Sequence, residues 1–242
     1  MAADARVLCA SNPLRLTCLL AASLAFCLAA ARAQTPAKSY ADLVAQAESG
    51  DPKTDYTALR RAYAALPDYD SRNAEVMKLY KEVDKYNEYF VTKQGDHCSE
   101  ISVISDRILA IEYTSIPAHS FRNGCILKSG NRLQMPRESF AEIGLMRSIL
   151  SSGDGKSIAT SFIVVTLDEE WMMLALANVE VDDLACHKSL LKVDGHYYDH
   201  IETYDDHGVY KVDIYFNVDA VEANTRHALP AEIARTCTGG LK

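Results

Sequence analysis

The spacing of apolar residues changes near residue 152, and this change constrains the fold more than any other feature of the sequence. Between residues 39 and 150 the apolar side chains recur at every third or fourth position, which is typical of helices. After residue 160 they occur in short runs and in strict alternation, which is typical of β-strands. A helical stretch followed by a strand-rich stretch predicts an α+β fold. We expect a helical region at 34–152 and an α+β region at 153–242.

The helical region divides at residues that start or stop helices. Gly50 ends the first predicted helix, Thr54 or Asp55 caps the second, and Pro67 ends it. Further helices are predicted at about 72–92, 99–113, 117–128 and 136–150. The apolar stripes of these helices are Tyr40, Leu43, Val44 and Ala47; Tyr56, Leu59, Tyr63 and Leu66; Val76, Tyr80, Val83 and Phe90; Ile101, Ile104, Ile108 and Ile111; and Phe140, Ile143, Met146 and Leu150.

The helices at 99–113 and 117–128 are predicted to form an antiparallel hairpin. The stretch 116–130 is similar to one tetratricopeptide (TPR) unit in its small and Gly positions, although its large aromatic positions mostly differ. Cys98 precedes the first helix and Cys125 lies near the end of the second, so the hairpin would bring them together. We therefore predict a Cys98–Cys125 disulfide, which leaves Cys186 to pair with Cys237.

The α+β region begins after a polar turn at 151–157. A short strand is predicted at 161–165, followed by a helix that starts in a capping box formed by Thr166 and Glu169. We interpret Glu169 and Glu170 as acids that complement the helix dipole rather than as a catalytic pair. A strand at about 184–192 and an antiparallel β-hairpin at 196–218 complete the region, with Tyr204 expected to face Val209 across the loop.

One face of this hairpin carries the candidate binding residues His200, Glu202 and Asp213. In the expected register His200 faces Asp213 and Glu202 faces Lys211, while the opposite face is apolar. His196 lies four positions from His200, roughly 13 Å along a strand, which is too far for the two rings to share a metal comfortably. We predict a solvated ion-pair face, no metal and no cofactor. A metal-dependent or acid–base hydrolase at these residues is the alternative.

No catalytic signature accompanies these elements. Gly155-Lys156-Ser157 matches only the tail of a phosphate-binding loop, and it stands between a helix and a strand in the wrong order. Cys186 and His187 are neighbours on a predicted strand, so their side chains point to opposite faces. We assign no catalytic residue and predict a non-enzymatic interaction or binding module.

The first 33 residues have the pattern of a secretory signal peptide. Arg6 and Arg15 precede an apolar run of about 16 residues, and Ala31-Arg-Ala33 forms the cleavage motif. The run is shorter than the roughly 20 residues that span a bilayer. We expect export to the periplasm or the medium, with no lipid anchor and no membrane insertion after cleavage.

Cleavage at this site would leave an acidic chain. The whole sequence carries a formal net charge of −8, the signal contributes +2, and so −10 remains on 209 residues. Such a charge disfavours nucleic-acid partners. A protein, peptide or carbohydrate partner is the expected kind, since seven tyrosines lie between Tyr40 and Tyr89 and can form a binding surface. The alternative is that these tyrosines fill gaps between small helices, with their hydroxyls at the surface. The remaining cysteines, in an oxidising compartment, are disulfide candidates: Cys98, Cys125, Cys186 and Cys237.

Six short sequence blocks occur in order between residues 51 and 219. They are DYTALR at 55–60, PDYD at 67–70, SILSSGDGKS at 148–157, FIVVTLDEEW at 162–171, VDGHYYD at 193–199 and YFNVD at 215–219. In this order they are similar to an uncharacterised exported bacterial family, domain of unknown function 4919. The resemblance implies export and a TPR-like helical part followed by a second part, and it implies no activity and no catalytic residues.

Overall fold

The computed structural model describes residues 38–92, 97–130, 135–177, 179, 188–204 and 211–225. The residues from Ser39 onward belong to one compact unit, Ser39–Lys242. Its described elements are α2 (Tyr40–Glu48), α3 (Tyr56–Ala64), α4 (Tyr69–Thr92), α5 (Cys98–Ile111), α6 (Ile116–Ser129), α7 (Met135–Leu150), η1 (Ile158–Thr160), β1 (Phe162–Ile163), α8 (Leu167–Leu176), β2 (Lys188–Val193), β3 (His196–Tyr204), β4 (Lys211–Asn217) and α10 (Asp219–Thr225). The α+β class is confirmed.

Side-chain caps explain where several helices start. The Ser39 hydroxyl accepts a hydrogen bond from the Asp42 amide, and the Asp42 carboxylate accepts one from the Ser39 amide, which completes a capping box. Asp55 caps α3 and Ser115 caps α6. At the other end of α6, Gly130 has a φ of 72°, the left-handed conformation that ends a helix.

The sheet has the strand order β1-β4-β3-β2, in which β1 runs parallel to β4 and the other pairs are antiparallel. The predicted hairpin is present, but the sheet is mixed because β1 joins it. The predicted register is wrong by two residues: His200 faces Tyr215, and Tyr204 faces Lys211 instead of Val209. A shift of two residues keeps every side chain on its predicted face, because the strand repeat is also two.

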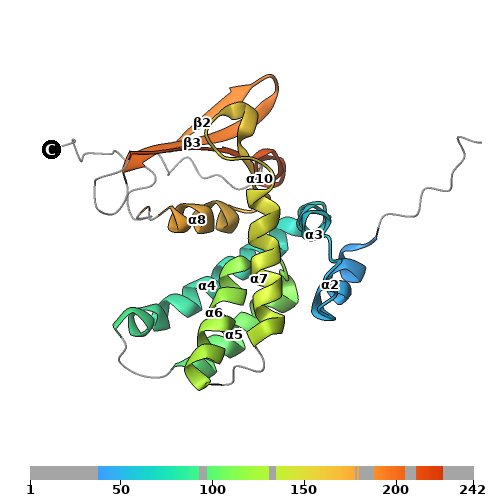
Figure 1. Cartoon of the computed structure of the whole chain (residues 1–242), viewed down its shortest axis with the longest axis vertical. Helices are drawn as coiled ribbons and strands as arrows, with labels where there is room; N and C mark the ends of the chain where they lie inside the picture. The colour runs from blue at the N-terminus through green and yellow to red at the C-terminus, as the bar shows by residue number, and fades with distance from the viewer. Residues whose placement is uncertain are drawn as a thin grey trace, which may run out of the picture. The chain divides into compact units, whose positions relative to one another are not determined.

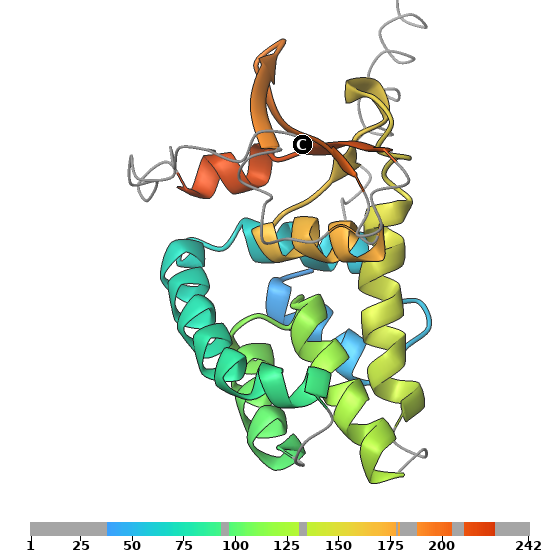
Figure 2. The ribbon, with the colours of Figure 1, turned by 90° about the vertical axis from the view of Figure 1, so that its left-hand side faces the viewer.

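The main core connects the sheet to the helices. Figures 1 and 2 show α8 between the sheet on one side and the helices α4, α5 and α6 on the other. The buried residues of this core come from α6, α7, α8, α10, three strands and the segments that follow β1, α8 and β4, so both predicted regions share it. They are Ile116, Leu145, Ile149, Phe162, Val164, Met173, Leu174, Val179, Ile201, Val212, Phe216, Val218 and Val221.

A second apolar cluster holds the helical hairpin against α4. It contains Val76, Val83, Ile104 and Ile108, which the helical spacing places on inward stripes. The hairpin formed by α5 and α6 is closed by a disulfide between Cys98 and Cys125, whose Cα atoms lie 5.2 Å apart. This is the pairing that the sequence predicts. A loop of this length contributes about 3–4 kcal/mol in the chain-entropy model. Cys186 and Cys237 lie outside the described residues.

The apolar stripe predicted for α7 is not its buried face. Leu145 and Ile149 are fully buried, whereas Phe140 is 62% exposed and Ile143 is 44% exposed. The reason lies at Gly144, where an added Cβ would overlap the ring of Tyr56. Because α3 approaches α7 so closely at this glycine, the helix turns Leu145 and Ile149 to the core and leaves Phe140 and Ile143 outside.

Candidate functional site

The predicted binding residues lie on the outer face of β3 and β4. His200 Nε2 is 2.8 Å from Asp213 Oδ1, and Lys211 Nζ is 2.7 Å from Glu202 Oε1. His200 also stacks on Tyr215, with ring centroids 4.3 Å apart. Asp213 and Glu202 are about half exposed, so these contacts form a solvated network. The described residues contain no group of three or more His, Cys, Asp or Glu side chains placed to hold a metal ion. The hydrolase alternative stays a prediction.

A buried ion pair joins α3 to α8. The Arg60 guanidinium donates to both carboxylate oxygens of Glu169 at 2.6 Å, and both side chains are almost fully buried. Arg60 also donates to the Ser148 hydroxyl at 3.0 Å and to the Ile163 carbonyl at 2.7 Å. Glu169 accepts a further bond from the Val165 amide. This network fixes α3, α7, β1 and α8 in one arrangement, because breaking it would leave a charge unpaired in the interior.

Two further carboxyls lie near this pair. Burial, together with the charges of Asp168 and Glu169, raises the pKa of Glu112 well above its usual range, and Tyr63 donates a hydrogen bond to it. Burial also raises the pKa of Asp168 to about 6, partly offset by a hydrogen bond from Tyr80. Both carboxyls therefore hold a proton more readily in the folded protein than in water.

Glu170 completes the row of acids at the start of α8. Lys188 Nζ donates a hydrogen bond to the Glu170 carboxylate at 2.9 Å, and the same ammonium group lies 2.5 Å from the Asp199 carboxylate. Burial raises the pKa of Glu170 to about 7 despite the attraction of Lys188. We call Glu112, Asp168, Glu169, Glu170 and Asp199 the buried acidic cluster. Glu169 and Glu170 do lie in the first turn of α8, as predicted, but they are also buried and paired, and only the Thr166 half of the predicted capping box is formed.

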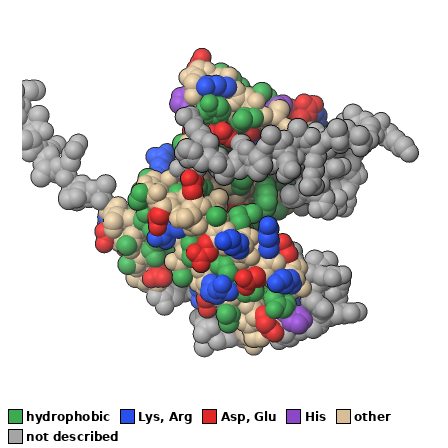
Figure 3. Space-filling view, turned by 180° about the vertical axis from the view of Figure 1, so that it is seen from behind, with side chains coloured by type: hydrophobic (Ala, Val, Ile, Leu, Met, Phe, Trp, Pro, Cys, Tyr) green, Lys and Arg blue, Asp and Glu red, His purple; other side chains and the backbone are tan. Residues whose placement is uncertain are grey.

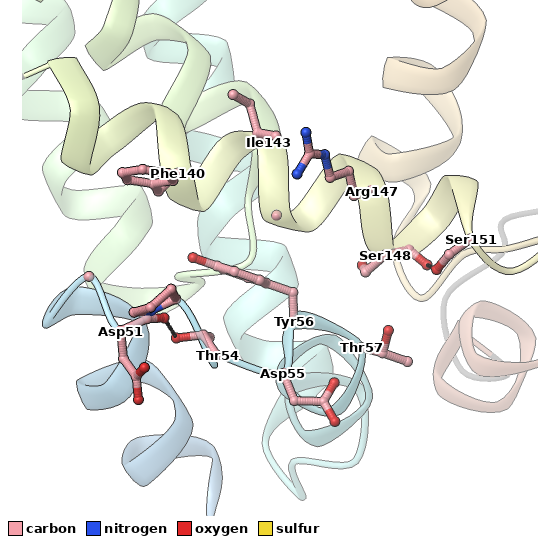
Figure 4. Close-up of a pocket in the computed structure, with 13 residues that line it drawn as sticks. Asp51, Thr54, Asp55, Tyr56, Thr57, Phe140, Ile143, Arg147, Ser148 and Ser151 are labelled. Carbon is pink, nitrogen blue, oxygen red and sulfur yellow. Dashed lines mark hydrogen bonds between the residues drawn. The ribbon is translucent and has the colours of Figure 1, made fainter.

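A cavity lies elsewhere, between α3 and α7 (Figure 4). Its volume is about 540 Å³, which is within the range of small-molecule sites. We call it the α3–α7 pocket. A second cavity of about 430 Å³, beside α4 and α5, includes Glu82, Tyr86 and Glu100 in its lining. The α3–α7 pocket is lined by Gly50, Asp51, Pro52, Thr54, Asp55, Tyr56, Thr57, Phe140, Ile143, Gly144, Arg147, Ser148 and Ser151.

The apolar wall of the α3–α7 pocket depends on the contact between Tyr56 and Gly144. Figure 4 shows the Tyr56 ring lying along α7, with Phe140 toward one end of the pocket and Ser148 toward the other. Phe140 and Ile143 are among the most exposed large apolar side chains of the described residues. The pocket therefore offers two aromatic rings and an aliphatic side chain to a ligand.

The polar side of the pocket connects to the buried ion pair. Arg147 lines the pocket from the last turn of α7 and Ser151 lines it from the turn that follows the helix, and between them Ser148 accepts the hydrogen bond from Arg60. The Arg60 side chain therefore holds Ser148, and with it this part of the pocket lining, in place. Sequence reasoning did not identify this site. The sequence contains two possible apolar stripes on α7. One includes Phe140 and Ile143 and ends in Arg147, and the other is formed by Ala141, Leu145 and Ile149. Since only one of them can face the core, the other was available to line a site.

The surface of the helices carries charges of both signs. Figure 3 shows Lys and Arg side chains interspersed with Asp and Glu over the helices on one face of the protein. Within the described part of the chain, no helix combines the length and the apolar character needed to cross a membrane.

Comparison with known proteins adds one relationship. No curated protein and no solved structure matches the chain. A family model, the domain of unknown function DUF4919, matches residues 33–227, which is most of the sequence and agrees with the resemblance of its short blocks. With this match, and with an α+β fold that contains both the predicted helical hairpin and the predicted β-hairpin, the chain belongs to the DUF4919 family.

Proposed function

We propose that this protein is an exported binding protein that holds a small, partly apolar ligand in the α3–α7 pocket. The observation that carries the proposal is the placement of Phe140 and Ile143, which are left exposed at a cavity while their neighbours Leu145 and Ile149 fill the core. Large apolar side chains gathered at a concave surface are typical of ligand sites.

The pocket is also built rigidly enough to select a ligand. Its α3 wall is held by Arg60, which bonds to Glu169 on α8 and to Ser148 on α7. Its floor is the contact between the Tyr56 ring and Gly144. Because these supports come from three different helices, the Tyr56 ring is held in place before a ligand binds, and preorganisation of this kind increases affinity.

Replacement of Phe140 by Ser should weaken binding of an apolar probe, such as 4-phenylbutan-1-ol, by about five- to thirtyfold, because an aromatic contact is lost. Isothermal titration calorimetry measures the change. Leu127→Ser is the matched control, because Leu127 is 53% exposed on α6 and does not line the pocket. Both variants should melt close to the parent temperature. Equal affinity in the Phe140→Ser variant, or no binding to the parent protein, would contradict the proposal.

The export part of the proposal rests on the signal pattern of the first 33 residues. The family match begins at residue 33, beside the predicted cleavage site, and the Cys98–Cys125 disulfide suits an oxidising compartment. Amino-terminal sequencing of protein recovered from the periplasm or the medium should begin at Gln34. Recovery of the chain only from the cytoplasm, with its first 33 residues intact, would refute export.

A further inference from the structure

We propose that the ligand of the α3–α7 pocket is a small apolar carboxylic acid whose carboxylate is bound by Arg147. This inference rests on the proposed binding function and specifies the chemistry of the ligand. It assigns Phe140, Ile143 and Tyr56 to the apolar body of the ligand and Arg147 to its charged end.

The order of side chains along α7 matches such a ligand. Phe140, Ile143 and Arg147 are three and four residues apart, so they follow one another along one face of the helix. All three line the pocket, and in Figure 4 the Arg147 guanidinium lies beyond Ile143 in the direction of Ser148. A molecule lying along this face would contact apolar side chains first and a cation at its end.

Arg147 is available for a ligand. Within the described part of the chain its guanidinium makes no hydrogen bond and no ion pair, and the side chain is exposed. Four other arginines are each paired with a carboxylate: Arg60 with Glu169, Arg72 with Asp68, Arg107 with Glu82 and Arg122 with Asp106. A guanidinium presents two parallel N–H donors that match the two oxygens of a carboxylate.

The two acids of the pocket lining accept hydrogen bonds from their own neighbours. Asp51 accepts hydrogen bonds from the Gln46 side chain at 2.7 Å and the Lys53 amide at 2.9 Å. Asp55 accepts from the Ala58 amide at 2.9 Å as the cap of α3. Figure 4 shows both carboxylates directed away from α7. Both carboxylates belong to the side of the pocket that precedes and starts α3, and Arg147 is the charged side chain among the lining residues on α7.

The size of the pocket favours a small molecule. A cavity of about 540 Å³ is within the range of sites that hold ligands of drug-like size. A peptide that presents its terminal carboxylate offers similar chemistry at the same residues, and it is therefore included as a competing ligand in the test.

The test compares two probes of nearly equal shape, 4-phenylbutanoate and its uncharged amide, by calorimetry at low salt. The parent protein should bind the carboxylate about three- to tenfold more tightly than the amide, because a charge-assisted hydrogen-bond pair is added. Arg147→Gln should remove this preference and leave the affinity for the amide unchanged. Arg61→Gln is the matched control, because Arg61 is exposed on α3 and lies outside the pocket lining, and it should retain the preference.

The outcomes separate this inference from the function on which it rests. Equal binding of the two probes to the parent protein, or a preference that survives in Arg147→Gln, overturns the carboxylate assignment while the pocket remains a binding site. If neither probe binds, the proposed function fails, and this inference fails with it. Tighter binding of the tripeptide Ala-Ala-Phe than of 4-phenylbutanoate, if lost in Arg147→Gln, replaces the small acid with a peptide carboxyl terminus.

Discussion

The free energy of unfolding should decrease by about 2–4 kcal/mol as the pH rises from about 5 to about 8, because buried carboxyls must lose their protons in the folded protein. Burial raises the pKa of Asp168 to about 6 and that of Glu170 to about 7, and it raises the pKa of Glu112 well above its usual range. Urea unfolding at a series of pH values measures the effect.

The sign follows from proton binding. At a pH between the pKa that these acids have in the unfolded chain and the higher pKa that they have in the folded protein, the native state holds more protons than the unfolded chain. Their contribution to stability is therefore fully present below the pKa of the unfolded chain, and it is lost as the pH rises through the pKa of the folded protein. Two cations face the buried acidic cluster, Arg60 at Glu169 and Lys188 at Glu170.

The variant Asp168→Asn should make the free energy of unfolding less dependent on pH in this range. Stability that stays constant or increases between pH 5 and 8 would show that the buried acidic cluster is ionised throughout.

Replacing Glu169 by Gln should destabilise the protein by about 3–5 kcal/mol, because the Arg60 charge would remain buried without a counter-charge. Arg60 is 2% exposed and Glu169 is 1% exposed, so water cannot solvate the remaining cation without rearrangement. Thermal or urea unfolding of the purified variant gives the loss directly.

Two further variants test whether the loss of stability in Glu169→Gln depends on the burial of the ion pair. Glu82→Gln removes the partner of Arg107, a pair whose side chains are both about half exposed, and it should cost less than about 1 kcal/mol. The double variant Arg60→Met with Glu169→Met should be more stable than either single variant, because no unpaired charge is left inside. A Glu169→Gln variant as stable as Glu82→Gln would mean that the buried ion pair does not hold α3 to α8.

Local features of the sequence were sufficient to predict much of the fold. Asp55 and Gly130 act as helix boundaries, and the inward stripe of Ile101, Ile104 and Ile108 is buried as its spacing requires. The Cys98–Cys125 pairing also follows locally, since a helical hairpin of the predicted lengths brings these two positions together. Each of these features is decided within about thirty residues of chain. The TPR-like character of the hairpin stays a prediction.

The features that could not be predicted depend on distant contacts. Glu169 has the sequence of a capping residue, but it binds Arg60 from a helix more than one hundred positions earlier. The hairpin register depends on the length of its loop, which composition does not determine. On α7 two stripes are equally plausible, and only the approach of Tyr56 at Gly144 decides between them. The same approach of Tyr56 to Gly144 forms the α3–α7 pocket, so this candidate site could not be predicted from the sequence either.

The α3–α7 pocket is tested most directly by NMR titration of the oxidised mature chain, residues 34–242, with 4-phenylbutanoate. The account predicts that the largest amide shifts, which saturate with added ligand, belong to Tyr56, Thr57, Gly144 and Ser151, and that the ring of Phe140 shows contacts to the bound ligand. Saturating shifts centred on His200, Glu202 and Asp213, or no saturating shifts at all, would contradict it.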